Sequence, residues 1–466
     1  MEFWIKAAQL FLSLAILVTL HEFGHFLPAK WFKMRAEKFY LFFNPWFSIV
    51  RFKKFRGKTV FSWFKKESPK KWDDEPDNTE WGLGWLPLGG YVKIAGMIDE
   101  SMDKEQMSKP AEPWEFRSKP AWQRLIVMIG GVTVNLILGF IIYIGVVFFW
   151  GKEEVKPSEI KHGLAVHPFL MKYNIKSGDN ILEVEGKSVT SPNDINKQIF
   201  LRDAKHLTIQ RIDGTKEKIT LPDDFGQTLF QEGAMQLFTL RHKSTVVDSV
   251  VVNSAAAKSG LKKGDQIILI DSNSIEYFDQ IQAGLYNKKG KIADISVIRS
   301  KDTLRLKATV KADGTIGFMP KSQGYVDSSA IYKKQFGLIE SFSVGISSGY
   351  NTIVDYIAQF KYVFTKKGAG QMGGFAAIGN MFPPLWDWQQ FWLTTAFLSV
   401  VLAFMNILPI PALDGGHVVF LIYEMITGKE PNKKVLEYAQ YIGMILLLSL
   451  VIYANFNDLY RWLFPN

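Results

Sequence analysis

Residues 7–29 read AAQLFLSLAILVTLHEFGHFLPA, an apolar run in which Glu22 carries the only formal charge. A helix needs about 20 predominantly apolar residues to cross the hydrocarbon core of a bilayer, and this run is long enough to do so. A cleaved signal peptide is the alternative interpretation, but no small-residue cleavage site follows the run. We therefore expect a membrane-spanning helix that is not removed by processing.

Three further runs carry no formal charge and are also long enough to span a bilayer, namely residues 125–150, 388–413 and 438–457. Loops rich in Lys and Arg stay on the cytoplasmic side of a membrane. This rule places residues 30–124 and 414–437 in the cytoplasm, and both termini and residues 151–387 on the opposite side. The basic residues that set this orientation are Lys30, Lys33, Arg35, Lys38, Arg117, Lys119, Arg124, Lys429, Lys433 and Lys434.

The composition excludes several classes of protein and site. The 466 residues carry a formal net charge of +10, and thirteen Lys or Arg against two acids lie between residues 30 and 71, directly after the first span. Basic residues at that place contact lipid headgroups, and no nucleic-acid-binding motif accompanies them. We expect a lipid bilayer and no nucleic acid as a partner. The chain has no cysteine, which excludes disulfides, iron–sulfur clusters and thiolate zinc ligands.

The pentapeptide HEFGH at residues 21–25 has the spacing of a zinc site. On a helix, His21 and His25 lie one turn apart on the same face, so both imidazoles can reach one ion. Zinc lowers the pKa of a bound water, and the adjacent Glu22 carboxylate can accept its proton. A chance match is the alternative, but three ionisable residues inside an apolar span are costly and indicate a functional site.

Two histidines leave a catalytic zinc one protein ligand short. The best candidate is Asp414, which follows the third span in the stretch NILPIPALDGGH at residues 406–417 and lies at the same predicted depth as the histidines. An Asp-Gly pair is also a common turn signal. His417 and, less favourably, Glu424 are the alternative ligands. We expect Asp414 to complete the metal site and His417 to form a local hydrogen bond.

An internal repeat occupies the long loop between the second and third spans. KSGDNILEVEG at residues 176–186 recurs as KKGDQIILID at residues 262–271, and in both copies a Gly-Asp turn leads into an apolar strand. The two copies resemble tandem circularly permuted PDZ domains. A spacer without binding function is the alternative, and neither copy contains a convincing catalytic residue.

Taken together and in order, these motifs resemble the site-2 protease family of intramembrane zinc metalloproteases, of the regulator-of-sigma-E protease type. The resemblance covers nearly the whole chain: HEFGH, then LPLGGYVK at residues 86–93, then the PDZ-like pair, then NILPIPALD at residues 406–414. It implies that zinc is bound by His21, His25 and Asp414 and that Glu22 is the catalytic base. It also implies a place for Asn406 near the substrate or the oxyanion.

Two stretches depart from the family pattern. A Gly-Phe-Gly stretch that is common after the first span is replaced by FNPW at residues 43–46, and a common Gly-Pro-x-x-Asn pattern in the second span reads GGVTVN at residues 130–135. Neither stretch contains a proposed ligand. We therefore expect both departures to affect substrate preference and to leave the metal site untouched.

The resemblance implies cleavage inside transmembrane segments of single-span proteins in the bacterial inner membrane, such as anti-sigma factors or remnant signal peptides. The PDZ-like units would then admit only proteins whose external domain has been removed. Two alternatives remain: a membrane-anchored zinc protease whose site lies outside the bilayer, and a catalytically inactive PDZ scaffold. The position of HEFGH inside an apolar run opposes the first, and Glu22 with a complete ligand set opposes the second.

A helix must unwind before it is cut, and an exposed strand edge can satisfy the freed backbone groups. Residues 38–52 are predicted to form a hairpin that dips into the membrane, and residues 81–94 a strand whose glycines allow close backbone approach. Of these, Gly89, Gly90 and Tyr91 are candidate substrate-binding residues. A small cytoplasmic sheet without substrate contact is the alternative.

We therefore expect an α-helical membrane protein with four transmembrane helices, a small cytoplasmic β-rich loop region and two extracytoplasmic PDZ-like α+β domains. Residues 334–366 have loosely helical apolar spacing, which indicates a helix on the outer membrane surface or against the PDZ-like units, and five glycines in 368–379 indicate a flexible or re-entrant loop. The expected segments are transmembrane helix 1 (1–30), the cytoplasmic loop (31–120), transmembrane helix 2 (121–150), PDZ-like domain 1 (151–237), PDZ-like domain 2 (238–323), the amphipathic helix and Gly-rich loop (324–387), transmembrane helix 3 (388–416), a cytoplasmic loop (417–436) and transmembrane helix 4 (437–466).

Overall fold

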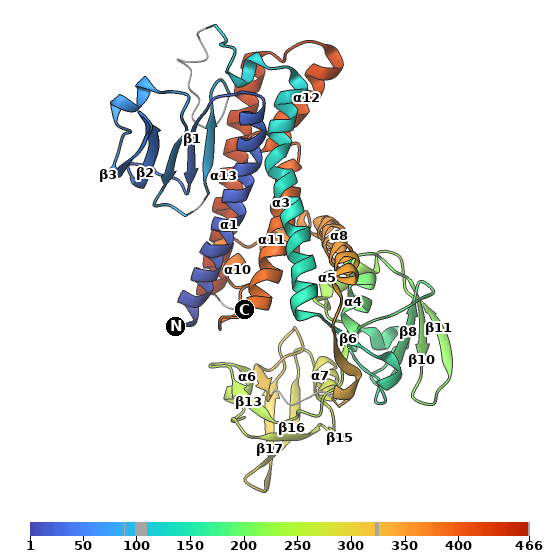
Figure 1. The fold of residues 1–466 in the computed structure, drawn as a ribbon. Helices are drawn as coiled ribbons and strands as arrows, with labels where there is room; N and C mark the ends of the chain where they lie inside the picture. The colour runs from blue at the N-terminus through green and yellow to red at the C-terminus, as the bar shows by residue number, and fades with distance from the viewer. Residues whose placement is uncertain (88, 98–109, 322–325, 465–466) are drawn as a thin grey trace. The chain divides into compact units, whose positions relative to one another are not determined.

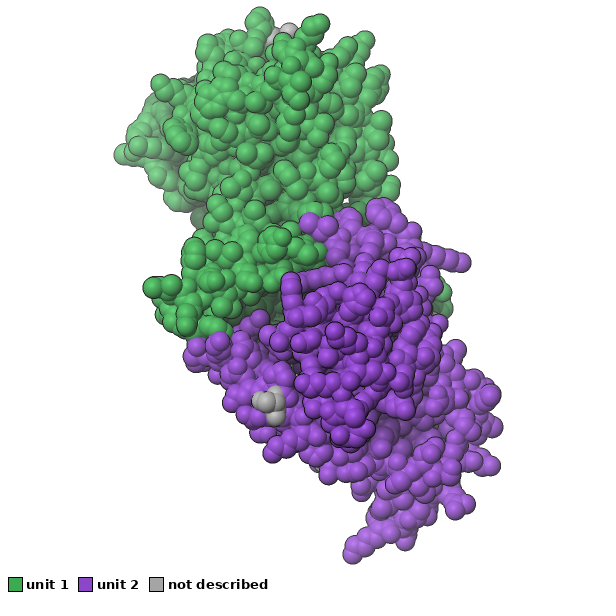
Figure 2. Space-filling model, turned by 90° about the vertical axis from the view of Figure 1, so that its right-hand side faces the viewer, with its two compact units in different colours: residues 1–150, 336–356, 368–466 green, residues 151–335, 357–367 purple. Residues whose placement is uncertain are grey.

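The computed structural model describes all residues except 88, 98–109, 322–325 and 465–466, and Figure 1 shows its fold. The described chain divides into two compact units, which Figure 2 colours separately. One unit comprises residues 1–150, 336–356 and 368–466, and the other residues 151–335 and 357–367. The first unit contains all of the long apolar helices.

Four helices of the first unit are long and apolar enough to cross a membrane, and they correspond to the four runs that were predicted to span it. They are α1 (Glu2–Trp31), α3 (Ala121–Trp150), α11 (Trp388–Ile407) and α13 (Lys433–Leu463).

The predicted third run does not continue to residue 413, because α11 ends at Ile407, before Pro409 and Pro411. Proline has no N–H to donate and disfavours helical geometry in the preceding residue. After this break the chain forms a separate helix, α12 (Asp414–Thr427), where a loop was expected.

The helices pack closely where small residues face one another. Helix α3 contacts α1, α11 and α12, and in Figure 1 it runs beside α1 and α11. A Cβ atom built on Gly24 of α1 would lie closer than 3.0 Å to the backbone of Gly130 and Gly131 in α3. The backbones of α1 and α3 are therefore in direct contact at this level.

The segment after α1 forms a five-stranded sheet with the order β3-β2-β4-β1-β5. Strand β1 pairs parallel with β4 and antiparallel with β5, and β2 pairs antiparallel with both β3 and β4. The strands are β1 (Ala36–Leu41), β2 (Ser48–Phe55), β3 (Lys58–Lys65), β4 (Glu80–Leu83) and β5 (Tyr91–Ile94).

The predicted hairpin over residues 38–52 is wrong, because β4 lies between β1 and β2. The reason is a buried polar cluster that spans the three strands. The Tyr40 hydroxyl of β1 donates to the Glu80 carboxylate of β4 at 2.5 Å, and Arg51 of β2 lies 3.7 Å from the same carboxylate. Burial, followed by the nearby Glu80 charge, raises the pKa of the Tyr40 phenol. The hairpin of this sheet is β2–β3 instead.

Residues 81–94 form two separate strands instead of the single strand predicted, and the second of them, β5, is at the edge of the sheet. Among the described strands, β5 pairs only with β1. Phe23 and Phe26 of α1 pack against Phe39 and Trp81 of the sheet, with ring centroids 5.2–6.3 Å apart. Phe23 inside HEFGH and Phe26 directly after it thereby fix this part of α1 to the sheet.

The second unit contains two copies of one arrangement. Four-stranded sheets with the orders β11-β10-β8-β9 and β15-β14-β16-β17 each have their own hydrophobic core. In each copy the Asp of the Gly-Asp repeat is buried and pairs with an Arg, Asp179 with Arg211 at 2.6 Å and Asp265 with Arg299 at 2.7 Å. The repeated sequence therefore encodes the same turn in both copies.

The first copy extends past the predicted boundary at residue 237, because β12 pairs with β7. Strand β18 likewise pairs with β13 in the second copy, and β6 pairs with β19. The remaining elements of this unit are β6 (Lys152–Val155), β7 (Leu164–Val166), β8 (Asn180–Val184), β9 (Lys187–Ser188), α4 (Pro192–Phe200), β10 (His206–Gln210), β11 (Lys216–Thr220), α5 (Phe225–Glu232), β12 (Phe238–Leu240), β13 (Val247–Val250), α6 (Ala255–Lys258), β14 (Gln266–Ile270), β15 (Asn273–Ser274), α7 (Phe278–Tyr286), β16 (Ile292–Arg299), β17 (Asp302–Thr309), β18 (Phe318–Pro320) and β19 (Ile331–Lys334).

The helical spacing over residues 334–366 corresponds to helix α8 (Leu338–Val363). Within the first unit this helix packs on α3, where the Thr352 hydroxyl donates to the Tyr143 hydroxyl at 3.1 Å.

The Gly-rich stretch after α8 was predicted to be a flexible or re-entrant loop, but it contains two short helices, α9 (Lys366–Gln371) and α10 (Phe375–Gly379). The Asp458 carboxylate of α13 accepts hydrogen bonds from the N–H groups of Gly374 and Ala377 at the start of α10.

Candidate metal centre

The structure brings His21, His25 and Asp414 together, although 389 residues separate His25 from Asp414 in sequence. The two Nε2 atoms are 3.2 Å apart, and Asp414 Oδ2 lies 3.3 Å from His21 Nε2 and 3.4 Å from His25 Nε2. Helix α1 supplies both imidazoles from successive turns, and the first residue of α12 supplies the carboxylate. Three potential ligand atoms thus form a nearly equilateral triangle.

The size of this triangle fits a zinc ion. Four ligands placed tetrahedrally at the usual zinc–nitrogen and zinc–oxygen distance of about 2.0–2.1 Å have edges of about 3.3–3.4 Å. Asp414 Oδ2 is buried and accepts no hydrogen bond from any described residue. A buried carboxylate oxygen without a donor is costly, and a cation at the triangle would satisfy it. Two imidazoles and one carboxylate are also a common donor set for catalytic zinc.

The Nδ1 atoms of both histidines contact residues of helix α3. His25 Nδ1 lies 2.8 Å from the Val127 carbonyl oxygen, so it carries the proton and leaves Nε2 free to bind a metal. The Asn135 amide lies 3.3 Å from His21 Nδ1, and its oxygen has no other partner among the described residues. With this oxygen turned toward an Nδ1–H group, both are satisfied and His21 Nε2 is also free. The Asn135 backbone is in turn fixed by Ser399, whose hydroxyl donates to its carbonyl at 2.6 Å.

Helix α3 also provides the space for the two imidazoles. A Cβ atom built on Gly131 would lie closer than 3.0 Å to the rings of both His21 and His25. The GGVTVN stretch therefore contacts both histidines through Gly131 and Asn135. The prediction that the departure at residues 130–135 leaves the metal site untouched is wrong, because this stretch packs directly behind the ligands.

A cavity of about 470 Å³ opens beside the triangle. Glu22 faces this cavity together with the three clustered side chains, and the backbone N–H of Val92 in β5 is directed at the Glu22 carboxylate. Edge strand β5 forms much of the opposite wall. The residues that line the cavity are His21, Glu22, His25, Lys38, Phe43, Gly90, Tyr91, Val92, Lys93, Ile94, Met97, Val127 and Asp414.

Comparison with known proteins identifies the family. The family model described as Peptidase family M50 matches residues 9–64 and 67–450. This chain belongs to peptidase family M50. The assignment confirms the resemblance to site-2 proteases that the sequence motifs indicate.

Three named relatives align with nearly the whole of this chain. The Regulator of sigma E protease of Haemophilus influenzae is 26% identical over 489 residues, which covers 99% of this chain and 100% of the relative. A protein of Rickettsia conorii named as a zinc metalloprotease is 26% identical over 96% of each chain. The Regulator of sigma-E protease RseP of Salmonella typhimurium is 24% identical over 98% of this chain and 99% of the relative. This M50 peptidase is a zinc metalloprotease and a membrane protein, and not an inactive scaffold.

Of the residues predicted to bind the substrate, three lie close to the triangle or line its cavity, and one does not. The Asn406 amide, at the end of α11, is 3.4 Å from His21 Nε2. Gly90 and Tyr91 line the cavity, whereas Gly89 is not among its lining residues and instead faces the Phe43 ring.

The alternative third ligands point elsewhere. Glu424 forms an ion pair with Arg124, and His417 lines a different cavity. Neither belongs to the cluster of potential ligand atoms, which among the described residues comprises His21, His25 and Asp414.

Sequence reasoning missed Asn135, Gly131 and Met97 as residues around the M50 site. Asn135 had a signal that could have identified it, because it is a strongly polar side chain in a run of 26 residues without a formal charge. No sequence signal pointed to Gly131 or Met97. The need for a glycine at position 131 depends on which helix crosses α1, and the sequence does not show this.

Proposed function

We propose that this M50 peptidase hydrolyses peptide bonds within the membrane-spanning segments of single-span proteins. The supporting observation is the position of the His21–His25–Asp414 triangle. Two of its three residues lie on α1, a helix apolar enough to span the bilayer, and Asn406 of α11, a second such helix, lies beside His21. A substrate bond that reaches these side chains must therefore lie in or next to the hydrocarbon region.

We assign His21, His25 and Asp414 as the zinc ligands and Glu22 as the catalytic base. Bound zinc supplies a Lewis acid that acidifies water and polarises a substrate carbonyl. Glu22 lines the same cavity as the ligands and accepts the proton of the attacking water on its carboxylate. The same carboxyl then protonates the leaving amine. Asn406, whose amide lies beside His21, is assigned to hold the oxygen of the scissile carbonyl.

The unwound substrate is proposed to pair with edge strand β5. Gly90, Tyr91 and Val92 lie on the wall opposite Glu22, and the outer edge of β5 has no partner strand among the described residues. Pairing with this edge satisfies backbone groups that the substrate exposes when its helix opens. Gly90, which lines the cavity, is the glycine proposed to let the substrate backbone pass closely.

The orientation and the substrate class complete the proposal. Basic residues beside α1 and α3 support an orientation with the β-sheet and the metal site on the cytoplasmic side of the bacterial inner membrane and both termini outside. The two repeats of residues 151–323 are assigned as extracytoplasmic PDZ-like domains that exclude substrates with bulky external domains. The proposed substrates are anti-sigma factors and remnant signal peptides, and two relatives carry names that refer to regulation of sigma E.

The position of the cut tests the proposal directly. Purified enzyme and a single-span protein in phospholipid vesicles should give fragments whose new ends lie inside the uncharged apolar segment. The Glu22→Gln protein serves as the blank, and mass spectrometry of both fragments locates the bond. A cut confined to the polar part outside the segment would contradict the proposal and favour a membrane-anchored protease that acts outside the bilayer.

Substitution of Val92 tests the role of β5. Val92→Pro removes the outward N–H and should lower cleavage about tenfold, the effect of losing roughly one strand hydrogen bond. Val92→Ala keeps the N–H and is the matched control, with cleavage close to that of the wild type. Both variants should retain zinc. Because the Val92 N–H also faces Glu22, substrate capture is measured separately in the Glu22→Gln background, and equal capture by both variants would refute pairing at β5.

A further inference from the structure

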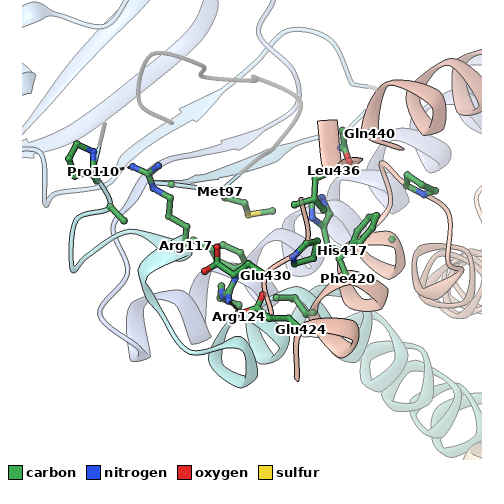
Figure 3. Close-up of a pocket in the computed structure, with 17 residues that line it drawn as sticks. Met97, Pro110, Arg117, Arg124, His417, Phe420, Glu424, Glu430, Leu436 and Gln440 are labelled. Atoms are coloured by element: carbon green, nitrogen blue, oxygen red, sulfur yellow. Dashed lines mark hydrogen bonds and ion pairs between the residues drawn. The ribbon is translucent and has the colours of Figure 1, made fainter. Parts of the chain in front are cut away.

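A second cavity, of about 310 Å³, lies next to the metal cavity within the same unit, and Figure 3 shows residues that line it. It is bounded by the turn after β5, the start of α3, one face of α12 and the start of α13. Its apolar wall includes Met97, Phe116, Phe420, Leu421 and Leu436. Since Gly416 and Phe420 line it and Asp414 lines the first cavity, the N-terminal turn of α12 separates the two.

The two cavities meet at Met97, which lines both of them. Strand β5 ends at Ile94, and the chain then turns at Gly96, with a φ of 73°, into Met97. A peptide paired along β5 and extended past Ile94 therefore passes Met97 and reaches the second cavity. An extended chain advances about 3.3 Å per residue, so only a few residues beyond the paired strand are needed.

Two arginines and two glutamates line this cavity, and of these four only Glu430 has no ion-pair partner in the described part of the chain. Arg124 forms an ion pair with Glu424, and Arg117 pairs with Glu115 at 2.5 Å, so both cations are already neutralised. Figure 3 shows Arg124 and Glu424 pointing toward each other. Glu430, on the exposed loop between α12 and α13, has no ion-pair partner among the described residues. A ligand that complements the cavity thus combines an apolar side chain with a cationic group.

We propose that the second cavity is a specificity subsite that binds the cytoplasmic flank of the substrate, with an apolar residue against Phe420 and Leu436 and a Lys or Arg at Glu430. The inference rests on the proposed function, because a substrate must first bind along β5. The cytoplasmic flank of a single-span protein is rich in Lys and Arg, which matches the free carboxylate of Glu430. Glu430 and the residues of the apolar wall act on affinity and do not touch the reacting atoms.

The first experiment varies the substrate flank in vesicles with full-length enzyme. Three forms of one single-span substrate are compared: a basic flank, the same flank with its Lys and Arg changed to Glu, and a form truncated directly after the apolar segment. We expect the acidic flank to raise KM up to about fivefold with little change in kcat, the upper range for one ion pair at an exposed site. The truncated form should also show a raised KM.

The second experiment varies the enzyme. Glu430→Lys should reverse the preference, so that the acidic flank binds better than the basic one. Leu436→Trp fills the cavity from α13 and should raise KM for the basic-flank substrate only, with cleavage of the truncated form unchanged. Glu437→Lys makes the same charge reversal on α13, does not line the cavity and is the matched control. Zinc content is measured in every variant and should equal that of the wild type.

The outcomes separate the subsite from the proposed function. If the wild type cuts within the apolar segment but KM is independent of flank charge in both the wild type and Glu430→Lys, the subsite is refuted and the proposed function stands. If Leu436→Trp impairs the truncated and the full-flank substrates equally, the cavity does not bind the flank. If the wild type cuts no substrate within its apolar segment, both inferences fail.

Discussion

Replacing Glu22 with Gln should lower substrate cleavage about a thousandfold, within the range that general acid–base catalysis contributes. Gln has the shape of Glu but cannot accept the proton of the attacking water. Glu22 lines the metal cavity without belonging to the cluster of potential ligand atoms, so the bound zinc should remain. The measurement is the initial rate of fragment formation in vesicles, together with zinc per chain by elemental analysis.

The matched control for this prediction is Glu2→Gln. It makes the same chemical change on the same helix, in the first turn of α1 and far from the metal site in sequence, and should leave both readouts unchanged. Undiminished cleavage by Glu22→Gln would overturn the assignment of the base. Loss of zinc from that variant would instead show that Glu22 holds the metal site together.

The Asp414→Ala protein should lose zinc, with affinity lowered by at least about a hundredfold, because even outer-shell partners of metal ligands account for 10–100-fold. Asp414 provides the only carboxylate of the three-atom cluster in the described part of the chain, and its loss leaves two imidazoles. Cleavage should fall with the metal. Zinc affinity is measured by competition with a chelator of known strength, which does not depend on activity.

The alternative ligands provide the controls. His417→Ala and Glu424→Gln should keep zinc close to the wild-type level, since both side chains line the second cavity. Gln at 424 retains a hydrogen-bond acceptor for Arg124, which avoids an unpaired buried cation. Zinc retained by Asp414→Ala and lost from His417→Ala would reverse the assignment of the third ligand.

Much of this architecture follows from local sequence patterns. The four spans are predictable because each is a long run without charge, and the two imidazoles because a helix places residues i and i+4 on one face. Asp414 could be predicted from its depth, since both histidines and Asp414 lie at the ends of apolar runs that the charge pattern predicts to face the cytoplasm. Each of these inferences uses only the sequence of a single helix or the position of a single membrane boundary.

The order of the sheet could not be predicted in the same way. Tyr40, Arg51 and Glu80 show no local pattern that brings them together, yet their buried cluster places β4 between two strands that are neighbours in sequence. Gly131 and Asn135 were misjudged for a similar reason. Their relation to the histidines depends on which face of α3 crosses α1, and hydrophobic periodicity does not specify that crossing in two helices that are apolar all round.

The glycine crossing of α1 and α3 restricts how the enzyme can open. At this crossing the backbones of Gly24, Gly130 and Gly131 are in direct contact, so no change of rotamer there can widen the gap. We therefore expect the two helices to move together at this crossing, with both imidazoles and their hydrogen-bond partners. A motion that admits a transmembrane substrate is then expected from the other walls of the metal cavity, which include β5 and Asp414 of α12.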